Sequence, residues 1–247
     1  TSAYQTELAG LKDAFIVEYK SDGKYFNSTY YGGKHDDYGN DIAIDGSGNL
    51  IIIGTTWSDD GIATLNANKK YRSGSSDVMI VKFNSGLNPI WGTYYGGLEI
   101  DEGNAVTTDA SGNIVVTGNT SSYSNISTVN AFQENLGGAG NAFIAKFNPT
   151  GQIDWGTYYG SNGSIGDHGN DVCADFNGNI ISTGTVGSNT DIFATTGAFQ
   201  TKDAGGHDGF IVKFNAGGAR LWGTFFGGLN EDYNLGICSD KNDDVFI

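Results

Sequence analysis

The sequence predicts an all-β fold, a β-propeller of four-stranded antiparallel blades, and three observations lead to this prediction. The chain of 247 residues repeats itself: equivalent positions lie 64, 64 and 67 residues apart, at Asp13, Asp77, Asn141 and Asp208. Each repeat contains short blocks of β-branched and aromatic residues bounded by turn residues. Several blocks are apolar on consecutive positions, which indicates sheets covered on both faces. Radially stacked blades give such cover, because each internal blade packs against two neighbours.

Each repeat contains four blocks, which we expect to form the four strands of one sheet. The first blocks occupy 13–19, 77–83, 141–147 and 208–214, and the second occupy 28–33, 91–97, 155–160 and 222–228. The third occupy 40–49, 104–113, 170–179 and 235–244, and the fourth occupy 50–54, 114–118, 180–184 and 245–247. An Asp-x-x-Gly-Asn turn joins the third block to the fourth, where Gly48, Gly112 and Gly178 can adopt positive φ.

These blocks resemble the SBBP family of bacterial β-propeller repeats. The matching string is read most completely from Asp77 to Thr120, and it recurs four times over almost the whole chain. The resemblance implies a propeller from a large secreted or surface-exposed bacterial protein. It also implies export of the parent protein by a type IX-like secretion route, since such proteins often use a C-terminal sorting domain.

The usual order of propeller strands assigns each block a place in its blade. We expect 40–45 as innermost strand A, 50–55 as B, 77–84 as C and 90–96 as outermost strand D. The chain then holds three full blades and two half-blades. The full blades are 40–97, 104–160 and 170–228, and the half-blades are 1–33 and 235–247. We expect a partial ring from a propeller of six to eight blades; the alternative is that the half-blades pair and close a four-bladed ring.

The long B–C loops and the D–A connections are expected on one face of the blades. The B–C loops span 57–76, 121–140 and 186–207, and are polar with scattered aromatic residues. Loops on a rigid scaffold are frequent binding sites, so this loop face is the predicted binding surface. The residues expected to contribute are Trp57, Tyr71, Tyr123, His168, Phe193 and His207. A shared aromatic before strand C, at Tyr4, Phe132 and Phe199, is expected to fill a gap between blades.

One acidic residue recurs in every D–A connection, at Asp37, Asp101, Asp167 and Asp232. If these carboxylates converge near the propeller axis they could hold Ca²⁺, which takes six to eight oxygen ligands. The alternative is that each aspartate accepts hydrogen bonds from backbone N–H groups of its own turn. Calcium is the only cofactor that the sequence suggests.

Charge and motifs restrict the function. The net charge is −15 and no Lys/Arg cluster is present, so neither nucleic acid nor an anionic membrane is an expected partner, and no apolar segment is long enough for membrane insertion. No catalytic motif stands out. We therefore expect a non-catalytic binding or scaffold module, extracellular or on the cell surface, that recognises a protein or a glycan. The alternatives are a polysaccharide hydrolase or lyase with an axial pocket, and a passive spacer or cargo domain recognised by export or surface-attachment machinery through its parent protein.

Overall fold

The computed structural model describes residues 3–187 and 192–247, and these residues form three four-stranded antiparallel sheets and two hairpins. The first hairpin contains β1 (Ala14–Tyr19) and β2 (Tyr25–Tyr31). The first blade contains β3 (Asp37–Ile44), β4 (Leu50–Thr56), β5 (Asp77–Phe83) and β6 (Pro89–Tyr95). The second contains β7 (Asp101–Thr108), β8 (Ile114–Thr120), β9 (Asn141–Phe147) and β10 (Ile153–Tyr159). The third contains β11 (His168–Ala174), β12 (Ile180–Thr185), β13 (Gly209–Phe214) and β14 (Arg220–Phe226). The last hairpin contains β15 (Cys238–Ser239) and β16 (Val245–Phe246).

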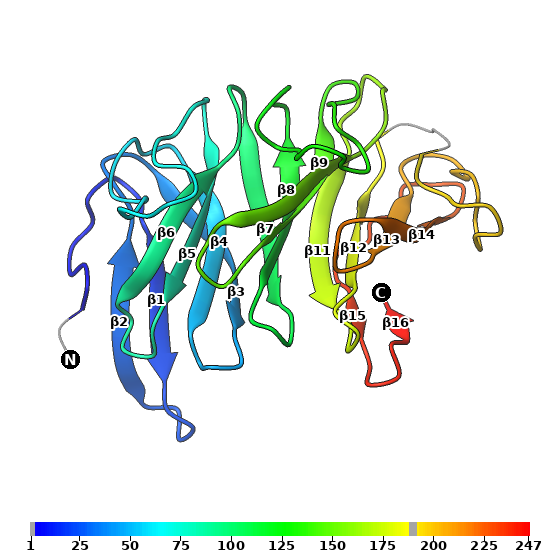
Figure 1. The fold of residues 1–247 in the computed structure, drawn as a ribbon. Coiled ribbons are helices and arrows are strands. Elements are labelled where there is room, and N and C mark those ends of the chain that lie inside the picture. The colour runs from blue at the N-terminus through cyan, green and yellow to red at the C-terminus, as the bar shows by residue number, and fades with distance from the viewer. Residues whose placement is uncertain (1–2, 188–191) are drawn as a thin grey trace.

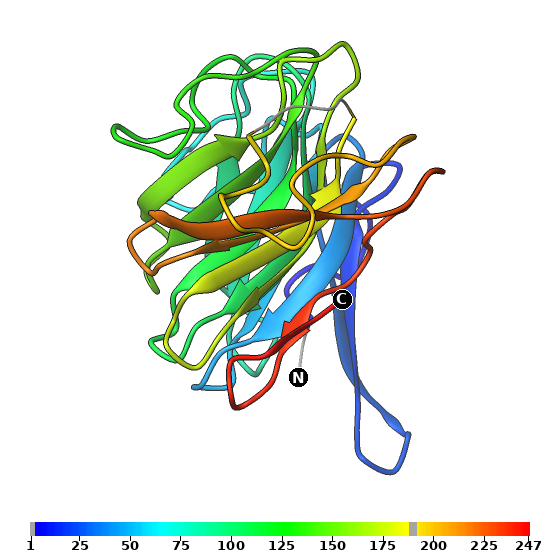
Figure 2. The same cartoon turned by 90° about the vertical axis from the view of Figure 1, so that its right-hand side faces the viewer.

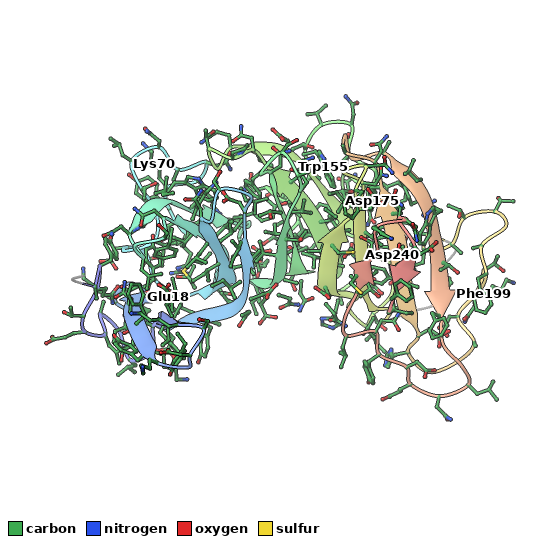
Figure 3. The ribbon with its side chains drawn as sticks, turned by 90° about the horizontal axis from the view of Figure 1, so that it is seen from below. Glu18, Lys70, Trp155, Asp175, Phe199 and Asp240 are labelled. Atoms are coloured by element: carbon green, nitrogen blue, oxygen red, sulfur yellow. The ribbon has the colours of Figure 1, made fainter. Side chains whose placement is uncertain are left out.

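The sheets stand side by side in an open arc, so the predicted propeller architecture and partial ring are confirmed (Figure 1). Neighbouring strands in each blade are consecutive in the chain, as expected for a meander that starts at the innermost strand. The first and last hairpins belong to separate sheets. Seen from below, Glu18 of the first hairpin and Asp240 of the last lie in different parts of the arc (Figure 3). In the part of the chain that the structure describes, no helix is long and apolar enough to cross a membrane.

The innermost strands β3, β7, β11 and β15 follow one another along the inside of the arc. A recurring asparagine links them. The Nδ2 atom of Asn40 donates to the Gly103 carbonyl at 2.7 Å, and Asn104 and Asn170 donate in the same way to Gly169 and Asn234, both at 2.8 Å. Each bond connects an innermost strand to the next repeat, so one side chain per repeat helps to set the spacing between adjacent blades.

The hydrophobic core lies between blades rather than inside a single sheet. Ile53 and Val78 of the first blade pack against Val116 and Phe143 of the second in one buried cluster. This two-sided burial explains the consecutive apolar residues in the sequence: all seven residues of β5 are buried. Burial of apolar area stabilises by roughly 25 cal/mol per Å², so contact between blades is the main source of stability.

In each complete blade, a buried ion pair joins a lysine of strand C to the aspartate that begins the A–B turn. The pairs are Lys82–Asp45 at 2.8 Å, Lys146–Asp109 at 2.9 Å and Lys213–Asp175 at 2.7 Å. Burial by itself would raise the pKa of these carboxyls. Hydrogen bonds from the lysine and from the asparagine that ends the turn outweigh burial and lower the pKa in all three. The same aspartates accept backbone N–H bonds of the turn, for example from Ser47 and Asn49 to Asp45 Oδ1 at 2.9 Å.

The two hairpins expose positions that complete blades bury. Phe15 of β1 is 68% exposed, whereas the equivalent Met79 of β5 is 0% exposed because the first hairpin packs against it. At the other end, the last hairpin covers only the inner part of the third blade and leaves Phe226 of β14 47% exposed (Figure 2).

Candidate binding face

The long B–C loops gather at one end of the blades, opposite the short A–B turns (Figure 1). Part of each loop also runs beside the outermost strand of its own blade. In the first blade, Thr64 N–H donates to the Gly92 carbonyl at 3.0 Å, and Tyr94 N–H donates to the Lys69 carbonyl at 3.2 Å. The loops therefore cover the outer sheet edge, which would otherwise be open to pairing with another chain.

A pocket of about 340 Å³ lies on this face, where the first hairpin meets the first blade. Its aromatic walls are Tyr38, at the start of β3, and Trp57, directly after β4, with ring centroids 5.6 Å apart and planes at 73°. Leu11 adds an apolar side and is 86% exposed. The edge-to-face pair is a favourable aromatic geometry, so the two rings hold each other in position.

Charged groups surround the aromatic pair. Lys12 Nζ lies 5.0 Å from the Tyr38 ring centroid, 2.5 Å from Tyr38 Oη and 3.6 Å from an Asp36 carboxylate oxygen. The hydrogen bond with Tyr38 raises the pKa of Lys12, and the nearby Asp36 charge adds to this, so the amine stays cationic. Lys34, His35 and Asp36 complete the lining. The pocket thus combines an apolar ring surface with donors and acceptors of both signs, a combination suited to an uncharged polar ligand.

This pocket is not a product of the repeat. At the two positions of Tyr38 and Trp57, the second blade has Glu102 and Ser121, and the third has His168 and Val186. Positions that the architecture requires recur in each blade, as the asparagine links and buried ion pairs do. An aromatic pair that is present in one blade only is not required for packing. The sequence pattern indicated Trp57 but not Tyr38, because their contact exists only after β3 and β4 pair.

The other residues predicted for the binding face have different positions. Tyr71 and Tyr123 are 75% and 74% exposed on their loops. His168 is exposed at the start of β11, and His207 is half-buried, with Nδ1 3.2 Å from the Val186 carbonyl oxygen. Phe193 requires a correction. Its ring is fully buried against Tyr159, Phe210 and Phe225, so it belongs to the core between the second and third blades. Positions 188–191 of the same predicted loop lie outside the described residues.

The D–A aspartates occupy separate blade junctions, and the described part of the chain contains no group of three or more His, Cys, Asp or Glu side chains placed to hold a metal ion. Each of Asp37, Asp101 and Asp167 is buried and accepts hydrogen bonds from its own junction. At Asp101, Oδ2 accepts from Gly97 N at 2.7 Å and Ser122 Oγ at 2.8 Å. Burial raises the pKa of these three carboxyls above the ordinary value, partly offset by such bonds. Asp232 is only half-buried, and Gly228 N donates to its Oδ2 at 2.7 Å.

Of the three aromatics predicted to fill a gap between blades, only Phe132 has that role, and Tyr4 is 52% exposed although a complete blade follows its hairpin. Phe132 lies half-buried between Tyr159 and Phe214, and the Arg220 guanidinium lies 4.3 Å from its ring centroid. Phe199 is 85% exposed, because no strands of the last hairpin reach it.

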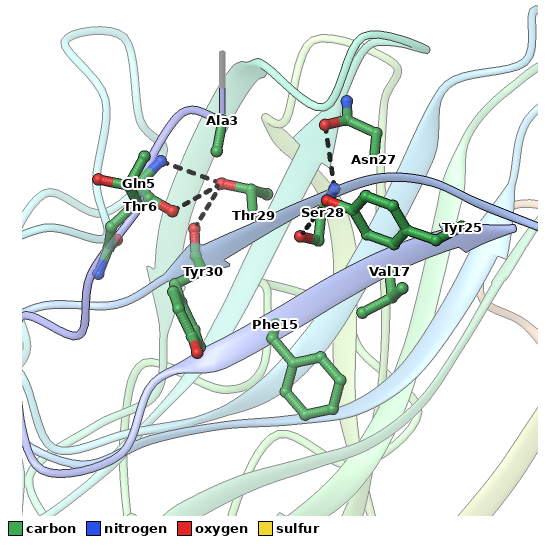
Figure 4. Close-up of a pocket in the computed structure, with 10 residues that line it drawn as sticks. All are labelled: Ala3, Gln5, Thr6, Phe15, Val17, Tyr25, Asn27, Ser28, Thr29 and Tyr30. Atoms are coloured by element: carbon green, nitrogen blue, oxygen red, sulfur yellow. Dashed lines mark hydrogen bonds between the residues drawn. The ribbon is translucent and has the colours of Figure 1, made fainter. Parts of the chain in front are cut away.

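A larger cavity of about 460 Å³ lies on the outward face of the first hairpin (Figure 4). Phe15, Val17 and Tyr25 contribute its apolar lining, and Asn27 and Thr29 its polar lining. Phe15 and Val17 correspond to Met79 and Val81, which another sheet covers in the first blade. This cavity therefore has the character of a blade-packing surface, and the smaller Trp57–Tyr38 pocket is the better candidate for a ligand site.

The fold and the recurring junctions define this chain as a β-propeller module whose loops converge on one face. Residues 27–62 match the family model of SBBP, the Beta-propeller repeat, so the chain carries this repeat. The chain is also similar to an uncharacterized WD repeat-containing protein of Acanthamoeba polyphaga mimivirus, with 27% identity over an alignment that covers 70% of this chain. It spans only 13% of that viral protein's length.

Proposed function

We propose that this chain is a non-catalytic binding module of a secreted or cell-surface bacterial protein, and that it binds a glycan or protein ligand through its loop face. The observation that carries the proposal is the Trp57–Tyr38 pocket. It is aromatic and open, and it departs from the repeat at two positions that the scaffold leaves free to vary.

The chemistry of the pocket favours a neutral saccharide among the possible ligands. Aromatic rings contact the apolar C–H face of a sugar, and the Lys34, His35 and Asp36 side chains at the rim can exchange hydrogen bonds with its hydroxyls. The net charge of −15 disfavours polyanionic ligands by long-range repulsion. An open pocket with aromatic walls would equally suit a protein partner with a complementary side chain, so the test includes both classes.

The test compares wild-type protein with Trp57→Ala and Tyr38→Ala on an array of immobilised neutral polysaccharides and on extracellular protein fractions. We expect saturable binding by the wild type and at least a tenfold loss in each variant. Phe176→Ala is the matched control, because Phe176 is 75% exposed on an A–B turn, far from the loop face, and its loss should leave binding unchanged. Binding that survives both pocket substitutions would place recognition elsewhere and contradict the proposal.

A further inference from the structure

The start of each strand C carries a buried polar residue whose surroundings are conserved through the repeats. This residue is Asp13, Asp77, Asn141 or Asp208, and all four are buried. In every repeat one oxygen of this residue accepts from the backbone N–H four residues before it, and in all but the first blade it also accepts from a glutamine side chain. In the third blade, Asp208 Oδ2 accepts from Gln200 Nε2 at 2.7 Å and from Ala204 N at 2.8 Å. In the second blade, Asn141 Oδ1 accepts from Gln133 Nε2 at 3.1 Å and from Gly137 N at 2.7 Å.

The other terminal atom of this residue faces acceptors. In the second blade that atom is Asn141 Nδ2, and it donates to three backbone carbonyls, those of Gly137, Gly140 and Ser161, at 2.8–3.0 Å. It also lies 3.3 Å from a carboxylate oxygen of Asp167. The position is therefore lined by four oxygen atoms, and the amide is the donor that satisfies them.

In the third blade the residue at this position is an aspartate, so an oxygen stands where the amide nitrogen would be. Asp208 is 0% exposed, and its Oδ1 accepts no hydrogen bond from any residue that the structure describes. By repeat equivalence its neighbours are the carbonyls of Ala204, His207 and Gly228 and the carboxylate of Asp232. The His207 carbonyl does lie at this junction, since it accepts from Asp232 N at 2.6 Å. A buried carboxylate oxygen facing only acceptors needs a positive charge.

In the first blade, a lysine supplies a positive charge to the carboxylate at this position. Lys69 replaces the glutamine of the other repeats, and its Nζ lies 2.6 Å from Asp77 Oδ2 and 2.6 Å from the Gly96 carbonyl oxygen. The ammonium thus neutralises the Asp77 carboxylate through the oxygen that glutamine holds in the other repeats. In the second blade, by contrast, the Asn141 amide satisfies the facing carbonyls directly. The third blade has neither, because Gln200 occupies the position of Lys69 and Asp208 that of Asn141.

We infer that the junction of Asp208 and Asp232 in the third blade is a calcium site, with Asp208 Oδ1, the Asp232 carboxylate and neighbouring backbone carbonyls as ligands. Oxygen-only coordination by carboxylates and carbonyls is what Ca²⁺ prefers, and Mg²⁺ is disfavoured because it demands a stricter octahedral geometry. Asp232 is half-buried and gives the ion access from solvent. The site belongs to one blade junction and does not require the four D–A aspartates to converge.

The experiment is thermal unfolding of the full chain with CaCl₂, MgCl₂ or chelator. At a free Ca²⁺ concentration of 100 times the Kd of the site, binding should raise the melting temperature by about 5–10 °C. We expect this shift for wild type with Ca²⁺ and not for Asp208→Asn, which supplies the amide that Asn141 provides in the second blade. That variant should melt in chelator no lower than the wild type, which separates loss of the ion from loss of the fold.

A gain-of-site variant completes the test. Asn141→Asp should melt lower than the wild type in chelator and recover with Ca²⁺, because it creates the same uncompensated oxygen in the second blade. Terbium luminescence titration should show one more bound ion in Asn141→Asp than in the wild type and one fewer in Asp208→Asn. Three results would each overturn the inference: no Ca²⁺ shift in the wild type, an unchanged shift in Asp208→Asn, or a stabilisation by acid in chelator that is lost in Asp208→Asn, which would mean that a proton fills the site.

Discussion

The buried lysine–aspartate pair is the residue-scale feature on which each complete blade depends. In the second blade, the Lys146 and Asp109 side chains are only 6% and 5% exposed. Removing one partner leaves an unpaired buried charge, so Lys146→Met should destabilise the protein by about 3–5 kcal/mol in urea unfolding. Lys34→Met removes the exposed pair with Asp60 and should leave the midpoint unchanged. If the two substitutions lowered the free energy of unfolding equally, burial would not determine how much each ion pair contributes to stability.

The same aspartates predict how stability depends on pH. The pKa values of Asp45, Asp109 and Asp175 are lowered in the folded state, so the unfolded chain binds more protons as the pH falls below about 4. Their stabilisation is present above that pH and is lost as the pH falls toward the folded pKa values. Asp37, Asp101 and Asp167 have raised pKa values, so their protonation just above pH 4 favours the folded state.

Urea melts between pH 2 and pH 7 measure this balance. We expect stability to rise slightly on acidification toward pH 4 and to fall below it. Asp109→Asn should be less stable than the wild type at pH 7 and should lose less stability between pH 4 and pH 2. A parallel pH profile for this variant would contradict the assignment.

At the scale of elements, the turn that joins strands C and D touches the preceding blade. Trp91 of β6 donates from Nε1 to the Pro149 carbonyl at 3.1 Å, and a Cβ added at Gly151 would lie 2.8 Å from the Trp91 ring. Gly151 has φ +83°. Two effects therefore oppose any side chain at this position: the left-handed backbone and the adjacent indole ring.

The first hairpin provides a matched control for this contact. Gly23 occupies the equivalent turn with φ +80°, but nothing lies within 4 Å of its Cβ position. Gly23→Ala should cost about 1–2 kcal/mol for the left-handed backbone alone. Gly151→Ala should cost about 1–3 kcal/mol more, because the indole must also shift. Unfolding free energies that match in the two variants would show that the packing between blades absorbs the added methyl group.

A hydroxyl on strand D makes a second link between elements. Tyr95 Oη donates to the Ile126 carbonyl at 2.5 Å, and Tyr159 Oη donates to the Phe193 carbonyl at 3.0 Å in the next junction. Tyr95→Phe should cost about 1–3 kcal/mol, since a buried carbonyl loses its donor. Hydrogen exchange should accelerate first around 121–127, in the loop that this bond anchors, and an unchanged exchange pattern would exclude the anchoring role.

At the scale of the whole molecule, the blades form an open arc in which each sheet contacts only adjacent sheets. Stability should therefore vary along the chain, as in other repeat architectures. We expect the slowest amide exchange in β8 and β9, whose blade has a complete blade on each side, and the fastest in β15 and β16. Uniform protection across all sheets would instead indicate a single cooperative unit.

The sequence alone predicted the strands, their turns and the propeller, because these follow from local periodicity and from a pattern that recurs every 64 to 67 residues. It could not tell Phe193 from an exposed loop aromatic, since the burial of Phe193 depends on Tyr159 and Phe210 from other strands. It identified acidic residues at each junction but not their partners. Only the tertiary structure brought Tyr38 to Trp57 and left the Asp208 oxygen without a donor. Contacts between blades join residues far apart in the chain, and local pattern carries no information about which atoms will face one another there.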